Sequence, residues 1–161
     1  MLLFFKIVNL LIRWFMVKYE GLFFDKETES LILALDKERL DVGIDVLHCT
    51  FKYLPSEEEI FDDIVGNYYF VDIVGYGYDK DNSGFCVKLP DELLDYYINF
   101  DYEEVLPHIT SSLSLNGESE NTRNLVFSYF DEPVRVKCRF GYYIKDDNGK
   151  TYVSYDKFYK N

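Results

Sequence analysis

Short apolar runs bounded by turn residues recur along the chain and predict a series of β-strands. Pro55 ends one run, and Asn148-Gly149 has the composition of a tight hairpin turn between the last two. The many Tyr and Phe residues favour strands as well. We expect strands over residues 17–24, 45–53, 68–79, 85–89, 106–115, 125–130, 133–144 and 150–155.

Three segments between these runs carry apolar residues at helical spacing and predict short helices. The first covers residues 29–40, the second follows a capping box of Ser56 and Glu59, and the third runs from Pro90 to about Asn99. Strands and helices in this order predict an α+β domain in which two antiparallel sheets face a central cleft, with the helices packed outside.

The chain of 161 residues is long enough for one domain, which we place at residues 16–161. The apolar segment 1–15 is too short, and too interrupted by Lys6, Asn9 and Arg13, to predict a membrane span. Three interpretations of this segment remain open: a helix packed on the domain, a weak interfacial anchor, or an extension upstream of a start at Met16.

The net charge of −12 argues against a surface that grips long nucleic acid, because such affinity comes from Lys and Arg residues. A short or cyclic nucleotide held in one local pocket is compatible with this charge. Cys49, Cys86 and Cys138 are far apart and form no CxxC pair, so neither a zinc site nor a disulfide framework is expected. Such cysteine usage favours a reducing compartment, the cytoplasm of a cell or of an infected host.

The chain contains only two histidines, and each is followed two residues later by a threonine. The two motifs are His48-Cys49-Thr50 and His108-Ile109-Thr110, and both lie on predicted strands. Residues i and i+2 of a strand point to the same face, so each motif presents an imidazole and a hydroxyl side by side. We expect the two pairs to close on one cleft from two strands.

Cleavage of a phosphodiester in line requires a base for the attacking oxygen and an acid for the departing oxygen. Two imidazoles can fill both roles near neutral pH, and threonine hydroxyls can donate to the nonbridging oxygens, where charge develops. This chemistry requires neither a metal ion nor a cofactor. His48, His108, Thr50 and Thr110 are therefore the catalytic candidates.

Four further residues are candidates for substrate binding. Lys52 and Ser112 each lie four residues after a motif histidine, so an ideal strand places them on the same face as that histidine. Tyr76 and Tyr78 share a face beside glycines that permit close approach of a ligand, and their rings could stack on a base. A surface lysine and rings that simply cover a sheet are the purely structural alternatives.

The flanked motifs Leu47-His48-Cys49-Thr50-Phe51 and Pro107-His108-Ile109-Thr110 resemble the 2H phosphoesterase superfamily. The run that continues through Lys52-Tyr53-Leu54-Pro55 is similar to tRNA-ligase-type cyclic phosphodiesterases and to small phage hydrolases of cyclic oligonucleotides. The resemblance covers residues 17–144. It implies a two-lobed 2H fold and a metal-independent hydrolase of a 2′,3′-cyclic phosphate or a cyclic (oligo)nucleotide.

Within that class, an RNA-processing enzyme and a phage or viral enzyme that degrades immune second messengers are both compatible with the motifs. Two other classes stay open: a nucleotide-binding module without catalysis, and a structural or interaction protein that uses its exposed aromatic residues. We expect a small nucleotide or cyclic oligonucleotide as partner, and neither long nucleic acid nor a membrane. The motifs do not distinguish the acid from the base.

Overall fold

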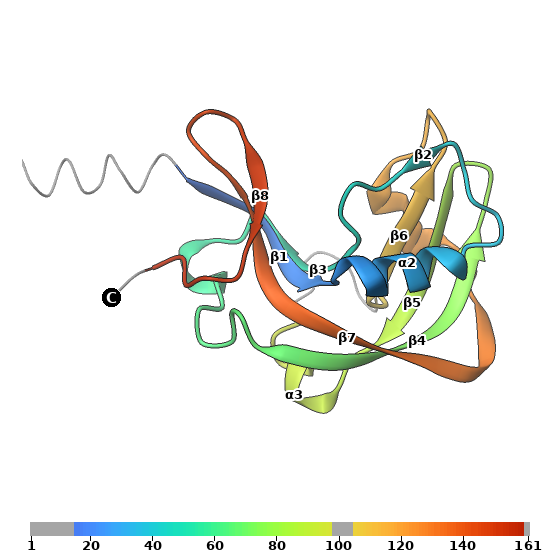
Figure 1. Cartoon of the computed structure of the whole chain (residues 1–161), viewed down its shortest axis with the longest axis horizontal. Coiled ribbons are helices and arrows are strands. Elements are labelled where there is room, and N and C mark those ends of the chain that lie inside the picture. The colour runs from blue at the N-terminus through green and yellow to red at the C-terminus, as the bar shows by residue number, and fades with distance from the viewer. Residues whose placement is uncertain (1–14, 98–104, 160–161) are drawn as a thin grey trace, which may run out of the picture.

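A computed structural model describes residues 15–97 and 105–159 (Figure 1). Most of this part forms one eight-stranded antiparallel sheet with the order β2-β6-β5-β4-β7-β1-β3, and β8 pairs with β7. The strands are β1 (Met16–Phe23), β2 (Val42–Gly43), β3 (His48–Tyr53), β4 (Tyr68–Tyr78), β5 (Asn82–Lys88), β6 (His108–Leu113), β7 (Ser128–Lys145) and β8 (Thr151–Ser154). The helical elements are α2 (Lys26–Ala34), α3 (Asp91–Leu94) and the 3₁₀ turns η1 (Glu57–Glu59) and η2 (Ser119–Asn124).

The expected α+β fold with two separate sheets facing a cleft is wrong, because β7 joins both halves of the molecule in a single sheet. β7 pairs with β4 between Ser128 and Arg139 and with β1 between Arg139 and Lys145. This strand of 18 residues therefore runs through both halves (Figure 1). Pro133, which lacks a backbone donor, predicted two separate strands over residues 125–130 and 133–144. Residues 130–133 are tolerated in the strand because they pair with neither β4 nor β1.

The predicted helices are shorter than expected. α2 begins at Lys26 because the Asp25 side chain accepts a hydrogen bond from the Thr28 amide at 2.7 Å and caps the helix. Glu59 does accept the Ser56 amide at 3.1 Å, but only the short turn η1 follows. α3 ends at Leu94. The end of the third predicted helix and most of the segment 1–15 lie outside the described residues.

The hairpin predicted at Asn148-Gly149 is confirmed, and β4 and β5 form a second hairpin. Between β4 and β5, the Asp79 carboxylate accepts the amides of Asp81 and Asn82 at 2.8 Å, which stabilises the turn. Between β7 and β8, Gly149 has φ +79°, a conformation that glycine adopts at little cost. In both places, residues within the turn stabilise the connection between the two strands.

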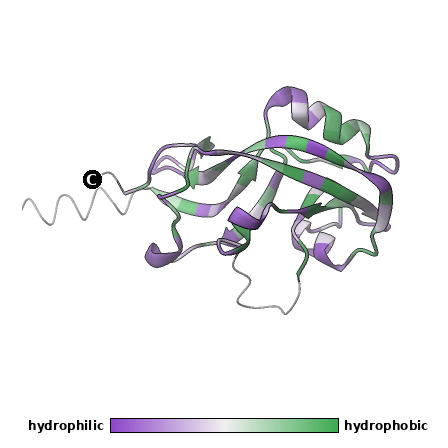
Figure 2. Cartoon of the chain, turned by 90° about the horizontal axis from the view of Figure 1, so that it is seen from below, coloured by the Kyte–Doolittle hydropathy of each residue, from purple (hydrophilic) through white to green (hydrophobic). Residues whose placement is uncertain are grey.

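Apolar side chains fill one face of the sheet. The long strands alternate between hydrophilic and hydrophobic residues (Figure 2), as a sheet with one buried face requires. Each fully buried aliphatic or aromatic side chain contributes about 1.5–3 kcal/mol to stability. The core includes Leu22, Ile32 of α2, Val71, Ile73, Phe85, Ile109, Val136, Cys138 and Phe140.

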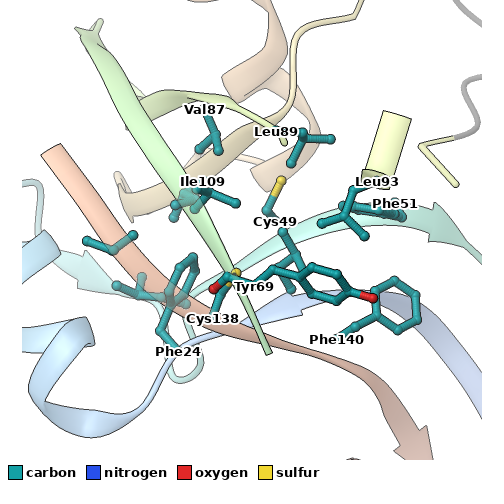
Figure 3. Packing of buried hydrophobic residues seen from close by; sticks show 14 of the residues in the cluster. Phe24, Cys49, Phe51, Tyr69, Val87, Leu89, Leu93, Ile109, Cys138 and Phe140 are labelled. Atoms are coloured by element: carbon teal, nitrogen blue, oxygen red, sulfur yellow. The ribbon is translucent and has the colours of Figure 1, made fainter. Parts of the chain in front are cut away.

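The sheet curls until strands from opposite ends of the strand order meet. β3 is one edge of the sheet and β6 lies next to the two-residue β2 at the other end, yet β3 and β6 are in contact. Cys49 of β3 and Ile109 of β6 lie in the same buried cluster (Figure 3). These are the central residues of the two His-x-Thr motifs, so packing of the core brings the motifs together.

Candidate functional site

The strand pairings place both motif histidines on one face of the sheet, opposite the core. Side chains directly opposite each other on paired strands share a face. Successive pairs across the strands therefore identify the residues that lie on the same face as each histidine. The row runs through His48, Phe23, Arg139 and Tyr68, and the same face continues from Asp72 through Lys88 and Cys86 to His108.

The curl of the sheet brings the two imidazoles within electrostatic reach of each other. Burial lowers the pKa of His48, the hydrogen bond to Val46 opposes this effect, and the charge of His108 lowers the pKa further. The backbone of His108 also lies beside the Cys49 thiol. Burial raises the pKa of Cys49 to about 12, and a hydrogen bond with the His108 backbone opposes that rise.

Both histidines are held by the same backbone contact. His48 Nδ1 lies 2.8 Å from the carbonyl oxygen of Val46, and His108 Nδ1 lies 2.9 Å from that of Leu106. A carbonyl oxygen can only accept, so Nδ1 carries a hydrogen in each ring. Nε2 is then the nitrogen through which either imidazole can exchange a proton.

The backbone around the two threonines is equivalent as well. Thr50 lies opposite Gly21 of β1, and Thr110 lies opposite Gly84 of β5. A Cβ added to Gly21 would lie 2.1 Å from the carbonyl oxygen of the residue that precedes Thr50, and one added to Gly84 would lie 2.5 Å from the corresponding oxygen before Thr110. Only glycine permits this approach of the motif strand to its neighbour.

A β-bulge follows each motif and moves the next side chains off the histidine face. The ladder skips Phe51 in β3 and Ser111 in β6, directly after each threonine. An extra residue of this kind reverses the alternation of side chains beyond it. The structure therefore does not bring Lys52 and Ser112 to the face of the histidines.

Lys52 lies in an acidic cluster instead. Its Nζ is 3.2 Å from the Glu59 carboxylate, and Lys52 pairs in register with Glu20 of β1. The Glu20 side chain is fully buried on the core side, where Oε2 accepts the Phe61 amide at 3.2 Å. Among the described residues, Oε1 of Glu20 has no hydrogen-bond partner.

Burial is the main reason why the pKa of Glu20 is raised to about 8. The Phe61 amide opposes this rise, and the charges of Glu59, Asp62 and Asp63 add to it. Glu20 therefore keeps its proton at neutral pH. A neutral carboxyl is compatible with a buried oxygen that lacks a partner.

Ser112 and Tyr76 belong to a buried polar network around Asp36, in the segment that follows α2. One carboxylate oxygen of Asp36 accepts hydrogen bonds from Ser83 at 2.9 Å, Ser111 at 2.8 Å and Ser112 at 3.3 Å. The other accepts the hydroxyl of Tyr76. Every described donor is satisfied within the network, so it anchors this segment to the sheet.

Tyr78 stacks on Tyr76 with 5.9 Å between ring centroids. A bulge at Val74 reverses the alternation of β4, because the ladder passes from Ile73 directly to Gly75. Both tyrosines therefore face the core side with Asp36, whereas Gly75 faces the histidine side. The structure does not bring these two candidate rings to the histidines.

The two motif threonines differ in what their hydroxyls do. Thr110 donates to the Ser119 carbonyl at 3.2 Å and accepts from Thr122 at 2.7 Å, and Thr122 in turn accepts from the Asn82 side chain at 3.0 Å. In this series of hydrogen bonds, the hydroxyl hydrogen of Thr110 is donated to the Ser119 carbonyl. Thr50 is half-buried, and its hydroxyl makes no hydrogen bond within residues 15–97 and 105–159.

The hydroxyl chain also anchors η2 and brings Arg123 towards His108. Thr122 is fully buried, and η2 contacts both β5 and β6. Burial lowers the pKa of His108, the hydrogen bond to Leu106 opposes this, and the charge of Arg123 lowers the pKa further. Arg123 is not among the site residues predicted from the sequence. The available signal was one basic residue in the polar segment after the second motif.

Tyr19 is a second residue near the site that sequence reasoning missed. Its ring stacks on His48 with 4.5 Å between centroids and on Tyr143 with 4.8 Å. Burial and the neighbouring Tyr143 raise the pKa of Tyr19, so its hydroxyl stays protonated. The Tyr19 oxygen lies 3.3 Å from His48 Nδ1, and the contact fixes the plane of the imidazole.

In the described part of the chain, no group of three or more His, Cys, Asp or Glu side chains is arranged to hold a metal ion. The three cysteines are free and buried. None of the helices in residues 15–97 and 105–159 is long and apolar enough to cross a membrane.

Comparison of the chain with protein-family models and with characterised proteins finds no match. The two motifs and the geometry of their surroundings are therefore the basis for a functional proposal.

The raised pKa of Glu20 predicts that the protein loses stability as the pH rises. The folded state holds one more proton than the unfolded state between pH 4.5, the unperturbed pKa, and about pH 8. Denaturant unfolding should show stability falling across this range, and Glu20→Gln should remove most of the fall. Glu58→Gln changes an exposed acid in η1 and serves as the control. An unchanged slope in Glu20→Gln would contradict the buried neutral carboxyl.

The two threonines are expected to respond differently to replacement by valine. Thr110→Val leaves the Thr122 hydroxyl and the Ser119 carbonyl without their partner, so it should destabilise the fold by about 1–3 kcal/mol. Thr50→Val removes a hydroxyl with no hydrogen bond among the described residues and should cost less than about 0.5 kcal/mol. Denaturant midpoints of the two variants provide the measurement, and equal losses would refute the difference.

Proposed function

We propose that this protein is a metal-independent phosphodiesterase that hydrolyses a 2′,3′-cyclic phosphate or a cyclic (oligo)nucleotide. The observation that carries the proposal is the pair of equivalent imidazoles. His48 and His108 lie on one face of the sheet within electrostatic reach, and each gives its Nδ1 hydrogen to the carbonyl two residues earlier. Nε2 of each ring then acts on the substrate.

Electrostatic coupling between the two rings suits them to act as one acid and one base. A proton on one imidazole makes protonation of the other less favourable, so the singly protonated pair dominates over an intermediate range of pH. In that state, one neutral Nε2 takes the proton of the attacking water. The protonated Nε2 of the other ring gives its proton to the departing oxygen.

Charge that develops on the nonbridging oxygens has two sources of stabilisation beside the histidines. The Thr50 hydroxyl can donate a hydrogen bond, and Arg123 brings a positive charge to the His108 side. Arg123 also donates from Nε to the Glu120 carbonyl at 2.7 Å, which orients its guanidinium. Thr110 acts indirectly in this proposal, because its hydroxyl holds η2 in place.

The likeness of the two motifs to 2H phosphoesterases supports the same reaction, although the expected two-sheet fold is not observed. Three free, buried thiols are compatible with a cytoplasmic enzyme of a cell or of an infected host. RNA-end processing and removal of cyclic nucleotide messengers would both use this chemistry.

A nucleotide-binding module without catalysis is the second candidate, and the structure of the second motif favours it in one respect. The Thr110 hydroxyl already donates its hydrogen bond to the Ser119 carbonyl. A bound phosphate therefore has one donor fewer than two motifs with available threonine hydroxyls would supply. Calorimetric binding of a 2′,3′-cyclic nucleotide without turnover would support this alternative.

Replacement of either histidine should abolish most of the activity. We expect His48→Ala and His108→Ala each to lower turnover by about 10²–10⁴-fold, the range for loss of one general acid or base. The double variant should lose less than the product of the single losses, since both rings serve one proton-transfer unit. The assay is turnover of 2′,3′-cyclic mononucleotides and cyclic dinucleotides, with circular dichroism and thermal melts as folding controls. Near-wild-type turnover in either single variant would refute the mechanism.

The pH profile should place the catalytic optimum on the acidic side of pH 6.5. Burial lowers the pKa of both imidazoles below that of an exposed histidine. The limbs of the kcat/KM profile report the pKa values of the essential acid and base in the free enzyme. A bell with its maximum below about pH 6.5 is the expected result. An activity that rises steadily above neutrality would show that another group is the base.

A further inference from the structure

Two neighbouring strands carry paired aromatic and basic side chains on the histidine face of the sheet. Tyr68 pairs with Arg139, and Phe70 pairs with Lys137. Lys137 Nζ lies 4.5 Å and the Arg139 guanidinium 4.8 Å from the centroid of the Tyr68 ring, and the guanidinium of Arg135 lies 5.4 Å from that of Phe70. We call these five residues the aromatic–basic ladder.

The rings of the ladder are open to solvent despite these contacts. Tyr68 is 58% exposed and Phe70 is 52% exposed. Cation–π contact explains why each ring lies beside a cation, but it leaves much of each ring without a partner among the described residues. Solvent-exposed aromatic rings can stack on nucleic-acid bases, and cations beside them can neutralise the phosphates.

Basic charge is concentrated here in a chain whose net charge is −12. Alternate residues of β7, Arg135, Lys137 and Arg139, are all basic, and Asp72 faces Arg135 from β4. Asp25 lies close enough to Lys137 for the lysine charge to affect its pKa. Three cations therefore share this part of the face with two acids, and the local charge has the sign that attracts phosphate.

The ladder and His48 belong to one row of paired residues across the sheet. Arg139 pairs with Phe23, and Phe23 pairs with His48, so Arg139 and His48 are two strands apart in one row. At about 4.8 Å per strand, the two positions are separated by about 10 Å. Phe23 between them is buried, and Tyr155 packs against both the Phe23 ring and the Arg139 guanidinium, so a strand of nucleotides that reaches both positions passes over Tyr155.

We infer that the aromatic–basic ladder binds a single-stranded oligonucleotide, whose bases stack on Tyr68 and Phe70 while its phosphates contact Arg135, Lys137 and Arg139. This inference deepens the proposed function and rests on it only for the position of the scissile phosphate at the histidines. The ladder holds nucleotides that flank that phosphate. The substrate class is then a short strand with several phosphates.

Binding to a strand that cannot be cleaved tests the ladder without turnover. The probe is a fluorescein-labelled oligodeoxythymidylate of about ten nucleotides, within the site sizes of single-strand binding proteins, and it lacks the 2′-hydroxyl. Anisotropy is measured with the full chain over a series of salt concentrations. Arg135→Gln combined with Lys137→Gln should raise Kd by about tenfold or more and reduce the slope of log K against log salt by about 1.4, because each phosphate contact contributes about 0.7.

Matched controls separate the ladder from general effects of charge and exposed rings. Lys150→Gln combined with Lys157→Gln makes the same charge change at two exposed positions outside the ladder and should leave Kd within about twofold. Tyr68→Leu and Phe70→Leu should each raise Kd by about fivefold or more. Tyr78→Leu removes a ring of similar exposure, 55%, from the opposite face of β4 and should have no effect.

Failure of the ladder and failure of the catalytic proposal give different results. In a His48→Ala background, strand binding should still weaken when Arg135 and Lys137 are replaced, since the ladder holds nucleotides that flank the scissile phosphate. Absence of strand binding at low salt, equal losses in ladder and control variants, or preference for anionic lipid vesicles over the strand would each overturn the ladder, whatever the turnover of mononucleotides. Ladder-dependent binding together with no turnover of any cyclic phosphate would retain the ladder and remove the catalytic proposal.

Discussion

The β-bulge after each motif threonine is the constraint on which the site depends. Side-chain alternation is reliable only while the ladder is regular, and one extra residue exchanges the two faces of everything beyond it. The bulges at Phe51 and Ser111 keep each histidine and its threonine on one face and turn Lys52 and Ser112 to the other. Along each motif strand, the residues on the histidine face therefore end at the threonine. Further residues of the site come from neighbouring strands.

The local parts of the fold follow from local residues, and these were predictable. The strands that contain His48 and His108, the β4–β5 hairpin and the Asn148-Gly149 turn all depend on residues close in sequence. Pairing between distant strands does not. The continuity of β7 through Pro133 and the single sheet that results depend on which neighbours each segment finds, and no run of apolar residues reveals them.

The same distinction applies to the candidate site. The two motifs could be found because imidazole and hydroxyl lie two residues apart on one strand. Arg123 and Tyr19 reach the histidines from other elements, through the docking of η2 and the pairing of β1 with β3. Tyr76 and Ser112 hydrogen-bond to Asp36 in a buried network, and this contact also joins residues that are distant in sequence. Net charge has a similar limit, because a sum over the chain does not show that Glu20 and its acidic neighbours are separate from the basic residues of the ladder.

The near-identity of the two motifs has a consequence for catalysis. A hydrolase must deprotonate one oxygen and protonate another, and the two imidazoles are held so alike that the backbone alone makes either ring fit for either role. Their surroundings break this symmetry. His48 is stacked against Tyr19, whereas His108 has the charge of Arg123 beside it. The charge of Arg123 opposes protonation of His108, and the charge of His108 opposes protonation of His48. In the proposed reaction, the docking of η2 through Thr110 and Thr122 therefore affects which histidine acts as the acid and which as the base, as well as the binding of phosphate.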